Sequence, residues 1–306
     1  MRWAIPEAEY MDPGTLGCQG CGGALSMRQV LKELGDDAIA VLPACCWSII
    51  DGPWPVHALN IPVFHTAFET AAVVATGVKA AKQIQGKDTT VVAWAGDGGT
   101  FDIGLQALSG AAERNEDIVF ICYDNEAYMN TGIQRSSATP AGTWTTTTPD
   151  QRPEPRPKKD IMAIMAAHRI PYAATATTAY PQDLARKVRT AVAMKGGMRF
   201  LHLLSACPPG WKMPAEQAIE AMRRAVQSNV FPLYEVRDGR DTTITMWPRD
   251  PVSIEDYFSL QGRFKPLLAD QEMLDIVRTG VTERWESLVE SHERPRRTAP
   301  SAATSR

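Results

Sequence analysis

The sequence Thr89-Thr90-Val91-Val92-Ala93-Trp94-Ala95-Gly96-Asp97-Gly98-Gly99 passes from an apolar, β-branched run straight into a glycine-rich turn. A short apolar run bounded by turn residues is typical of a strand buried on both faces. A second such run, 118–124, leads into Asn125-Glu126, and the residues 104–114 between the two runs have a helical pattern. This strand–helix–strand order predicts parallel strands with helices packed on both faces of the sheet.

The same alternation continues through most of the chain. Further strands are expected at 38–42, 172–176 and 200–205, and further helices at 26–34, 68–84, 159–168 and 182–194. We therefore predict an α/β protein with a doubly wound, mostly parallel sheet.

Two stretches depart from this rhythm. Residues 126–157 lack periodicity and are rich in Thr, Pro and Gly, and a loop of that length is usually functional or disordered. The pattern also weakens after about residue 238, with one last helix expected at 272–289. The resulting division is a domain over 1–240, a C-terminal extension over 241–291 and a polar tail, 292–306, that is expected to be disordered.

Composition excludes several classes of function. The chain has 306 residues and a formal net charge of −3, which gives no electrostatic case for binding nucleic acid or an anionic membrane. It has no apolar run long enough to span a bilayer and no apolar N-terminal stretch of the signal-peptide kind. A cytoplasmic location is the default expectation. In a reducing compartment the six cysteines are better interpreted as metal ligands or buried thiols than as disulfides.

The glycine-rich turn predicts a binding site for a metal and a diphosphate. Parallel sheets bind ligands beyond the carboxyl ends of their strands, and the turn lies at such an end. Gly96, Gly98 and Gly99 allow a tight turn and a close approach to phosphate. Asp97 is a hard oxygen ligand suited to Mg²⁺, and Asn125 at the end of the next strand can reach the same ion. The alternative is an ordinary glycine turn in which Asp97 caps the following helix.

The cysteines predict a second metal centre. Cys18 and Cys21 form a Cys-x-x-Cys pair in a glycine-rich loop, and Cys207 lies in a turn before Pro208. Zinc and a [4Fe–4S] cluster both take four such ligands, so spacing leaves both open. Adjacent residues of an extended chain point to opposite sides, so one of Cys45 and Cys46 is expected to ligate. Core packing is the expectation for a further cysteine inside an apolar strand, Cys122.

Several motifs together resemble the β subunit of 2-oxoacid:ferredoxin oxidoreductases, of which pyruvate synthase is the best-known example. They are Cys18-Gln19-Gly20-Cys21-Gly22, the run from Gly96 to Gly104, the run from Tyr123 to Gly132, Ser136 to Pro140, Cys207 to Trp211, and Phe231 to Glu235. The resemblance covers roughly residues 10–240, and the combination of motifs is very specific. It implies a thiamine-diphosphate-binding fold and oxidative decarboxylation of a 2-oxoacid, with electrons passed to a [4Fe–4S] cluster.

The resemblance also implies roles for individual residues. Asp97 and Asn125 would hold Mg²⁺ by their side chains and Ala127 by its carbonyl group, while Asn130 would face the cofactor and substrate. Four thiols would hold the cluster near the cofactor: Cys18, Cys21, Cys46 and Cys207. The chain has no further ferredoxin-like cysteine runs, so electrons would leave through other subunits (α, γ and a ferredoxin-like δ, or fusions of them) to ferredoxin or another acceptor.

Two departures from the family leave the substrate open. Gly23 stands where the family often has Glu, and Ala44-Cys45-Cys46-Trp47 replaces the usual Thr-Gly-Cys followed by a small aliphatic residue. Pyruvate, aromatic oxoacids, oxalate and branched-chain oxoacids all stay possible. Two rival functions also stay open, namely a subunit of a non-oxidative thiamine-diphosphate decarboxylase or synthase, and a non-enzymatic zinc-binding interaction module.

Overall fold

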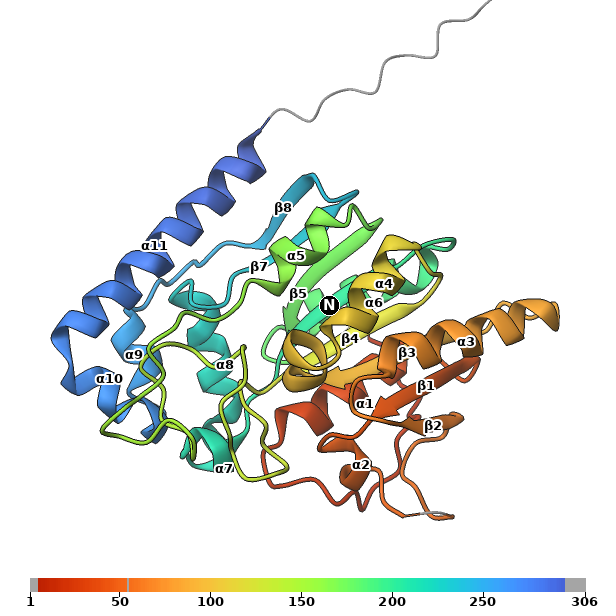
Figure 1. Cartoon of the computed structure of the whole chain (residues 1–306), viewed down its shortest axis with the longest axis horizontal. Helices are drawn as coiled ribbons and strands as arrows, with labels where there is room; N and C mark the ends of the chain where they lie inside the picture. The colour runs from red at the N-terminus through yellow and green to blue at the C-terminus, as the bar shows by residue number, and fades with distance from the viewer. Residues whose placement is uncertain (1–4, 54, 295–306) are drawn as a thin grey trace, which may run out of the picture.

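The computed structural model describes residues 5–53 and 55–294 as a single α/β architecture (Figure 1). Its helices are α1 (Gly22–Leu34), α2 (Trp47–Ile50), α3 (Ala71–Ile84), α4 (Leu105–Glu113), α5 (Ile161–Ala167), α6 (Pro181–Ala193), α7 (Pro208–Trp211), α8 (Ala218–Gln227), α9 (Ile254–Phe258), α10 (Lys265–Ala269) and α11 (Gln271–Glu293). Its strands are β1 (Ala38–Pro43), β2 (Val63–Thr66), β3 (Thr90–Gly96), β4 (Val119–Asp124), β5 (Tyr172–Thr177), β6 (Arg199–Leu204), β7 (Leu233–Arg237) and β8 (Asp241–Met246). Three short helical turns complete the set: η1 (Gly98–Asp102), η2 (Ala215–Gln217) and η3 (Gly262–Phe264).

All eight strands belong to one sheet with the order β2-β1-β3-β4-β6-β5-β7-β8. The first six in this order are parallel to one another. The last two are antiparallel, β7 to β5 and β8 to β7. The prediction of a doubly wound, mostly parallel sheet is therefore confirmed.

Helices cover both faces of the sheet, as the continuous apolar strands require. On one face, α1 and α6 pack with Leu42, Trp94 and Leu201 in a single buried cluster. On the other face, α3, α4 and α5 pack against the alternate strand residues, among them Cys122. Cys122 is fully buried, so its predicted place in the core is confirmed.

Helix starts differ from the sequence prediction at two places. α1 begins at Gly22 instead of residue 26, because the Cys21 sulfur caps the helix by accepting from the Ala24 amide at 3.4 Å. α3 begins at Ala71 instead of residue 68. The preceding loop is held against the glycine-rich turn by Phe68, whose ring lies 5.9 Å from that of Tyr128.

The sequence prediction missed the C-terminal part of the sheet and several helices. β7 and β8 form a hairpin across Asp238 and Gly239, both of which have positive φ. An Asp-Gly pair between two alternating segments is a strong hairpin signal that the prediction did not use. The boundary expected near residue 240 falls inside this hairpin. β2 and the amphipathic α8 were also missed.

The C-terminal segment forms a third buried cluster with α7 and α8, centred on Trp211, Phe258 and Phe264. α11 then runs along the edge of the molecule beside β8 (Figure 1). It extends beyond the 272–289 expected for the last helix, and most of the predicted disordered tail lies outside the described residues. No helix in the described part of the chain is long and apolar enough to cross a membrane.

Candidate cofactor and cluster site

The carboxyl ends of β3 and β4 bring the predicted metal ligands together. These strands pair in parallel with Gly96 opposite Tyr123, so the residues that follow each strand lie side by side. Asp97 follows β3 directly, and Asn125 follows β4. We call Asp97, Asn125 and Ala127 the oxygen site.

The side-chain amide of Asn125 is in contact with both other members of the oxygen site. One end of this amide lies 2.8 Å from the carbonyl oxygen of Ala127 and 3.0 Å from Oδ1 of Asp97. With its nitrogen at that end, the amide donates a hydrogen bond to each. With its oxygen there, three oxygen atoms crowd together and need a cation among them. Octahedral Mg²⁺ has ligands at about 2.0–2.1 Å, which sets neighbouring oxygens about 2.9 Å apart. The donor set and its spacing therefore fit magnesium.

Asp97 is buried, and none of the described residues forms an ion pair with it. Its Oδ2 accepts a hydrogen bond of 2.5 Å from the Ser136 hydroxyl. Burial and the neighbouring charge of Asp124 raise the pKa of Asp97 well above its usual range. A bound cation would reverse this shift, because it stabilises the ionised carboxylate. The side chain makes no capping hydrogen bond to η1, which argues against the plain capping role.

The structure shows a packing role for one glycine of the turn. None of Gly96, Gly98 and Gly99 has a positive φ, so the turn does not depend on a left-handed backbone. A Cβ atom on Gly98 would instead lie 2.1 Å from the Tyr128 ring. Tyr128 in turn donates a hydrogen bond of 2.8 Å to Asp102. Gly98 is thus required by close packing within the chain.

A buried ionic network lies beneath the oxygen site. Lys158 forms ion pairs with Asp124 and with Glu126, the two acidic residues that flank Asn125. His202 Nε2 lies 2.7 Å from Asp124 Oδ2. Burial opposes ionisation of Asp124, but Lys158 and His202 outweigh it and lower its pKa to about 2. Asp124 is therefore a permanent anion that fixes the end of β4.

The four predicted cysteine ligands come from three places in the fold. Cys18 and Cys21 precede α1, Cys46 precedes α2, and Cys207 lies between β6 and α7. We call these four the thiol site. Burial raises the pKa of Cys46 to about 12, and Cys45, Cys207 and Cys21 contribute to the rise. Burial raises the pKa of Cys207 to about 11, and Cys21 and Cys18 contribute. At neutral pH, Cys46 and Cys207 therefore need a bound metal to become thiolates.

Cys45 and Cys46 face different neighbours, as expected of adjacent residues. The Cys45 thiol is hydrogen-bonded to the hydroxyl of Tyr123, whose ring stacks on that of Trp94. Cys46 is influenced by the charges of Cys207 and Cys21 as well as by that of the adjacent Cys45. Among the described residues, no three His, Cys, Asp or Glu side chains are close enough to hold a single metal ion.

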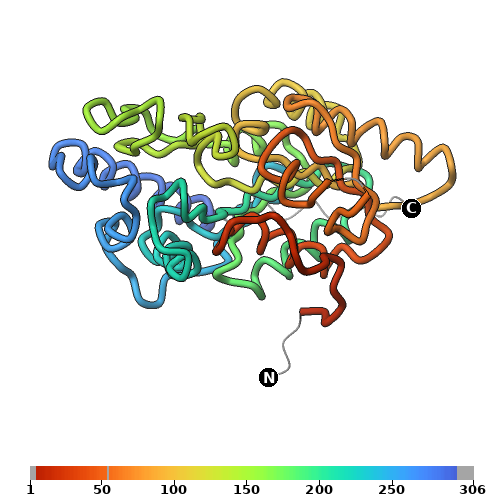
Figure 2. The backbone as a smooth tube through the Cα atoms, turned by 90° about the horizontal axis from the view of Figure 1, so that it is seen from below, coloured from red at the N-terminus to blue at the C-terminus, as the bar shows by residue number. Residues whose placement is uncertain are grey.

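The predicted substrate-facing residue, Asn130, is exposed on the loop that follows the oxygen site. This loop, 126–157, is irregular but packed, with several threonines buried within it. The Trp144 amide donates to the Arg263 carbonyl at 2.8 Å, and Figure 2 shows the yellow-green loop beside the blue C-terminal segment.

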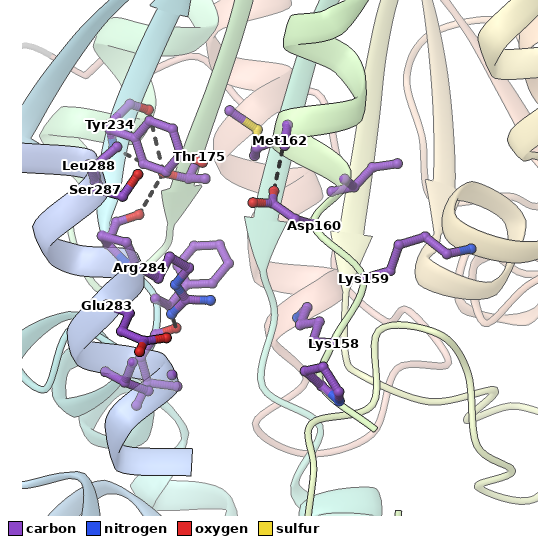
Figure 3. A pocket seen from close by; sticks show the side chains of 18 of the residues that line it. Lys158, Lys159, Asp160, Met162, Thr175, Tyr234, Glu283, Arg284, Ser287 and Leu288 are labelled. Carbon is purple, nitrogen blue, oxygen red and sulfur yellow. Dashed lines mark hydrogen bonds between the residues drawn. The ribbon is translucent and has the colours of Figure 1, made fainter. Parts of the chain in front are cut away.

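Two hollows flank the site. The larger, about 1870 Å³, lies between α11, α5 and β7, with Lys158 at its base and Arg284 on its α11 wall (Figure 3). Neither the oxygen site nor the thiol site contributes to its lining, but Glu126 and His202 of the ionic network do. A smaller, open hollow of about 570 Å³ is lined by Cys18 and Pro208, so it adjoins the thiol site.

Sequence reasoning missed the residues that support the ligands. Ser136, Glu126 and Lys158 lie in or beside the long loop, and Arg263 lies far downstream in η3. Ser136 and Glu126 fall within the motifs shared with the family, and this could have indicated that they belong to the site. For Arg263 we find no local signal, because its partner is 137 residues away.

Comparison with known proteins shows first the class of protein to which the chain is similar. Residues 50–203 match the family model of the C-terminal thiamine-pyrophosphate-binding domain of thiamine pyrophosphate enzymes. The 2-oxoglutarate:ferredoxin oxidoreductase of Magnetococcus marinus shares the fold, with a TM-score of 0.58 and 23% identity over 72% of this chain and 82% of that one.

Curated relatives define the family more closely. The ketoisovalerate oxidoreductase subunit VorB of Pyrococcus furiosus is 49% identical over 94% of this chain and 94% of its own length. The pyruvate synthase subunit PorB of Methanothermobacter thermautotrophicus is 48% identical over 88% of this chain and 94% of its own. The chain belongs to the β-subunit family of the thiamine-diphosphate-dependent 2-oxoacid:ferredoxin oxidoreductases, and the predicted resemblance is confirmed.

Proposed function

We propose that this chain holds magnesium and thiamine diphosphate at the oxygen site and a [4Fe–4S] cluster at the thiol site. In this proposal the cluster accepts the electrons released by oxidative decarboxylation of a 2-oxoacid. The observation that carries the proposal is the contact of the Asn125 amide with Asp97 and Ala127 at 3.0 and 2.8 Å. That arrangement supports a cation held between two adjacent strand ends, where a diphosphate can complete its coordination.

Thiamine diphosphate, when bound, supplies an electron sink for breaking the bond to the carboxylate carbon. The chain's own residues bind and position. Asp97, Asn125 and Ala127 would orient the diphosphate through the cation, and the packed loop 126–157 would exclude water. Asn130, exposed at the start of that loop, would contact the substrate.

The thiol site supports an iron–sulfur cluster because three separate segments that carry its cysteines meet there. The Gly22 amide beside Cys21 donates to the Ala206 carbonyl beside Cys207 at 2.8 Å, and Cys46 packs against the same buried cluster as Cys21. Cys21 adds a specific feature, since its sulfur accepts from the Ala24 amide at the start of α1. Backbone amides directed at sulfur stabilise thiolates and tune cluster potentials.

For the substrate we propose a small aliphatic 2-oxoacid. The curated relatives are named for ketoisovalerate and pyruvate at 49% and 48% identity, so the comparison does not rank the two. We further propose a cytoplasmic complex in which other subunits complete the active site and pass electrons to ferredoxin or another acceptor. The single chain would then be inactive.

The decisive experiment uses the complex purified anaerobically, with a panel of 2-oxoacids and an artificial electron acceptor. We expect turnover with at least one aliphatic oxoacid and about four iron atoms per copy of this chain at the thiol site. The isolated chain should show no turnover until its partner subunits are added back. Stoichiometric zinc without iron, or robust turnover by the chain alone, would contradict the proposal.

A further inference from the structure

Glu126 lies between two of the proposed magnesium ligands and has an unusual backbone conformation. It separates Asn125 from Ala127 and has a φ of 69°. A non-glycine residue in this left-handed region is strained and persists only where its surroundings fix it. The carboxylate is also buried, with the residue 3% exposed.

Four contacts fix this conformation. The Glu126 carboxylate accepts from Lys158 Nζ at 2.9 Å and from Arg263 Nη2 at 2.5 Å. Its carbonyl oxygen accepts from the Thr139 hydroxyl at 2.8 Å, and its amide donates to Asp124 Oδ1 at 2.9 Å. The orientation of the Ala127 carbonyl and the Asn125 side chain follows from this backbone.

Arg263 holds that segment at two of its residues, Glu126 and Asn125. It is 1% exposed, and its guanidinium lies 4.1 Å from the centre of the Trp211 ring. The Trp211 indole donates to the Asn125 carbonyl at 2.8 Å. Arg263 therefore holds Glu126 directly and Asn125 through the stacked Trp211.

The same arginine stacks on the turn that carries Cys207. Trp211, whose ring lies 4.1 Å from the Arg263 guanidinium, closes the short helix that begins after Cys207, and its amide donates to the Cys207 carbonyl at 2.7 Å. Arg263 Nη1 is buried and has no hydrogen-bond partner among the described residues. A cationic N–H group left without an acceptor is costly, and cluster sulfur is an acceptor that would relieve the cost.

Resting on the proposed function, we propose that Arg263 is a positioning residue shared by the two sites. Through Glu126 and Trp211 it holds the Asn125–Ala127 segment in its magnesium-binding form. Through its charge it stabilises the reduced, more negative state of the cluster and so raises the reduction potential.

The test compares the complex carrying R263M or R263K with the wild-type complex, all purified anaerobically. R278M is the matched control, because Arg278 is an exposed cation that pairs with Glu255 and Asp275 away from both sites. Two quantities are measured: the Mg²⁺ concentration that half-saturates thiamine diphosphate binding, and the cluster midpoint potential from an EPR-monitored titration.

We expect R263M to raise the half-saturating Mg²⁺ concentration roughly 10–100-fold, as is typical when support of a metal ligand is lost. R263M should also lower the cluster potential. R263K keeps the charge but not the planar fork, so it should retain the potential and raise the Mg²⁺ requirement less. R278M should change neither quantity.

An unchanged Mg²⁺ requirement or an unchanged potential in R263M would overturn the proposal. If R263M does not assemble, R263K and E126Q replace it, since E126Q preserves shape while removing the charge that Arg263 binds. An equal Mg²⁺ requirement in E126Q and wild type would then overturn it. Failure of the wild-type complex to bind thiamine diphosphate with magnesium would instead refute the proposed function.

Discussion

The oxygen site and the thiol site are built in opposite ways. The oxygen site uses two neighbouring strand ends, and its members lie within four residues of β3 and β4. The thiol site draws on the start of α1, the start of α2 and the turn after β6, which are far apart in the sequence. Secondary structure therefore positions the first, whereas only the packing of several segments positions the second.

This difference implies that the two sites tolerate change differently. When a ligand at a strand end is lost, the backbone cannot move to bring another group into its place, because the sheet holds the backbone fixed. A thiol on a turn has more local freedom, but each one would be a separate attachment of the proposed cluster. Four sets of substitutions, taken from the largest expected effect to the smallest, test the comparison.

Removing the charged member of the oxygen site should have the largest effect. Asp97→Ala deletes the anionic ligand of the proposed cation, so activity of the complex should fall by about 100-fold or more. Steady-state assays and thiamine diphosphate content measure the effect. D88A is the control, because Asp88 is an exposed surface anion. Wild-type activity and cofactor content in D97A would remove Asp97 from the site.

Substitutions at the thiol site should distinguish Cys46 from the adjacent Cys45 by their effect on iron content. Cys46→Ser should lower the iron content of anaerobically purified protein, and so should the corresponding changes at Cys18, Cys21 and Cys207. Cys45→Ser should keep the iron, because the Cys45 thiol is hydrogen-bonded to Tyr123. Cys122→Ser is a second control from the core. Iron loss in C45S but not in C46S would reverse the assignment of the ligand.

The ionic network below the oxygen site predicts a specific acid sensitivity. Lys158 and His202 lower the pKa of Asp124 to about 2, so its folded pKa is below the unfolded value of about 4. The contribution to stability is present above pH 4 and is lost as the pH falls from about 4 to about 2. It amounts to on the order of 2 kcal/mol.

Chemical denaturation of the wild-type chain and of D124N across this pH range checks the prediction. The difference in free energy of unfolding between the two proteins should shrink as the pH approaches 2. A difference that stays constant from pH 6 to pH 2 would show that Asp124 is not held ionised by its neighbours.

A pair of glycine substitutions gives the smallest expected effect. Gly98→Ala places a Cβ atom 2.1 Å from the Tyr128 ring, so it should destabilise the chain by about 1–3 kcal/mol. Gly77→Ala is the matched control within α3, where nothing lies within 4 Å of the new atom. It should stabilise the chain by about 0.5–1 kcal/mol. Thermal unfolding of both variants gives the comparison, and equal effects would mean that Tyr128 moves aside freely.

Much of the fold was predictable because its signals are local. The apolar run before Gly96 is buried on both faces in β3, and the run before Asn125 behaves likewise in β4. The hairpin of β7 and β8 was missed although the Asp238-Gly239 pair indicates a hairpin turn. The start of α1 was misplaced because its cap is a cysteine sulfur, which is not one of the usual capping groups.

The sequence by itself determined the class of sheet, the ligand types at the oxygen site and the family to which the chain belongs. Each of these rests on residues a short distance apart, where strand ends and turn chemistry act locally. The tertiary structure alone decided that Trp211 donates to the Asn125 carbonyl, and that Arg263 reaches Glu126 across 137 residues. Such contacts depend on how separate segments pack, and a buried charge finds its partner only when the chain has folded around both.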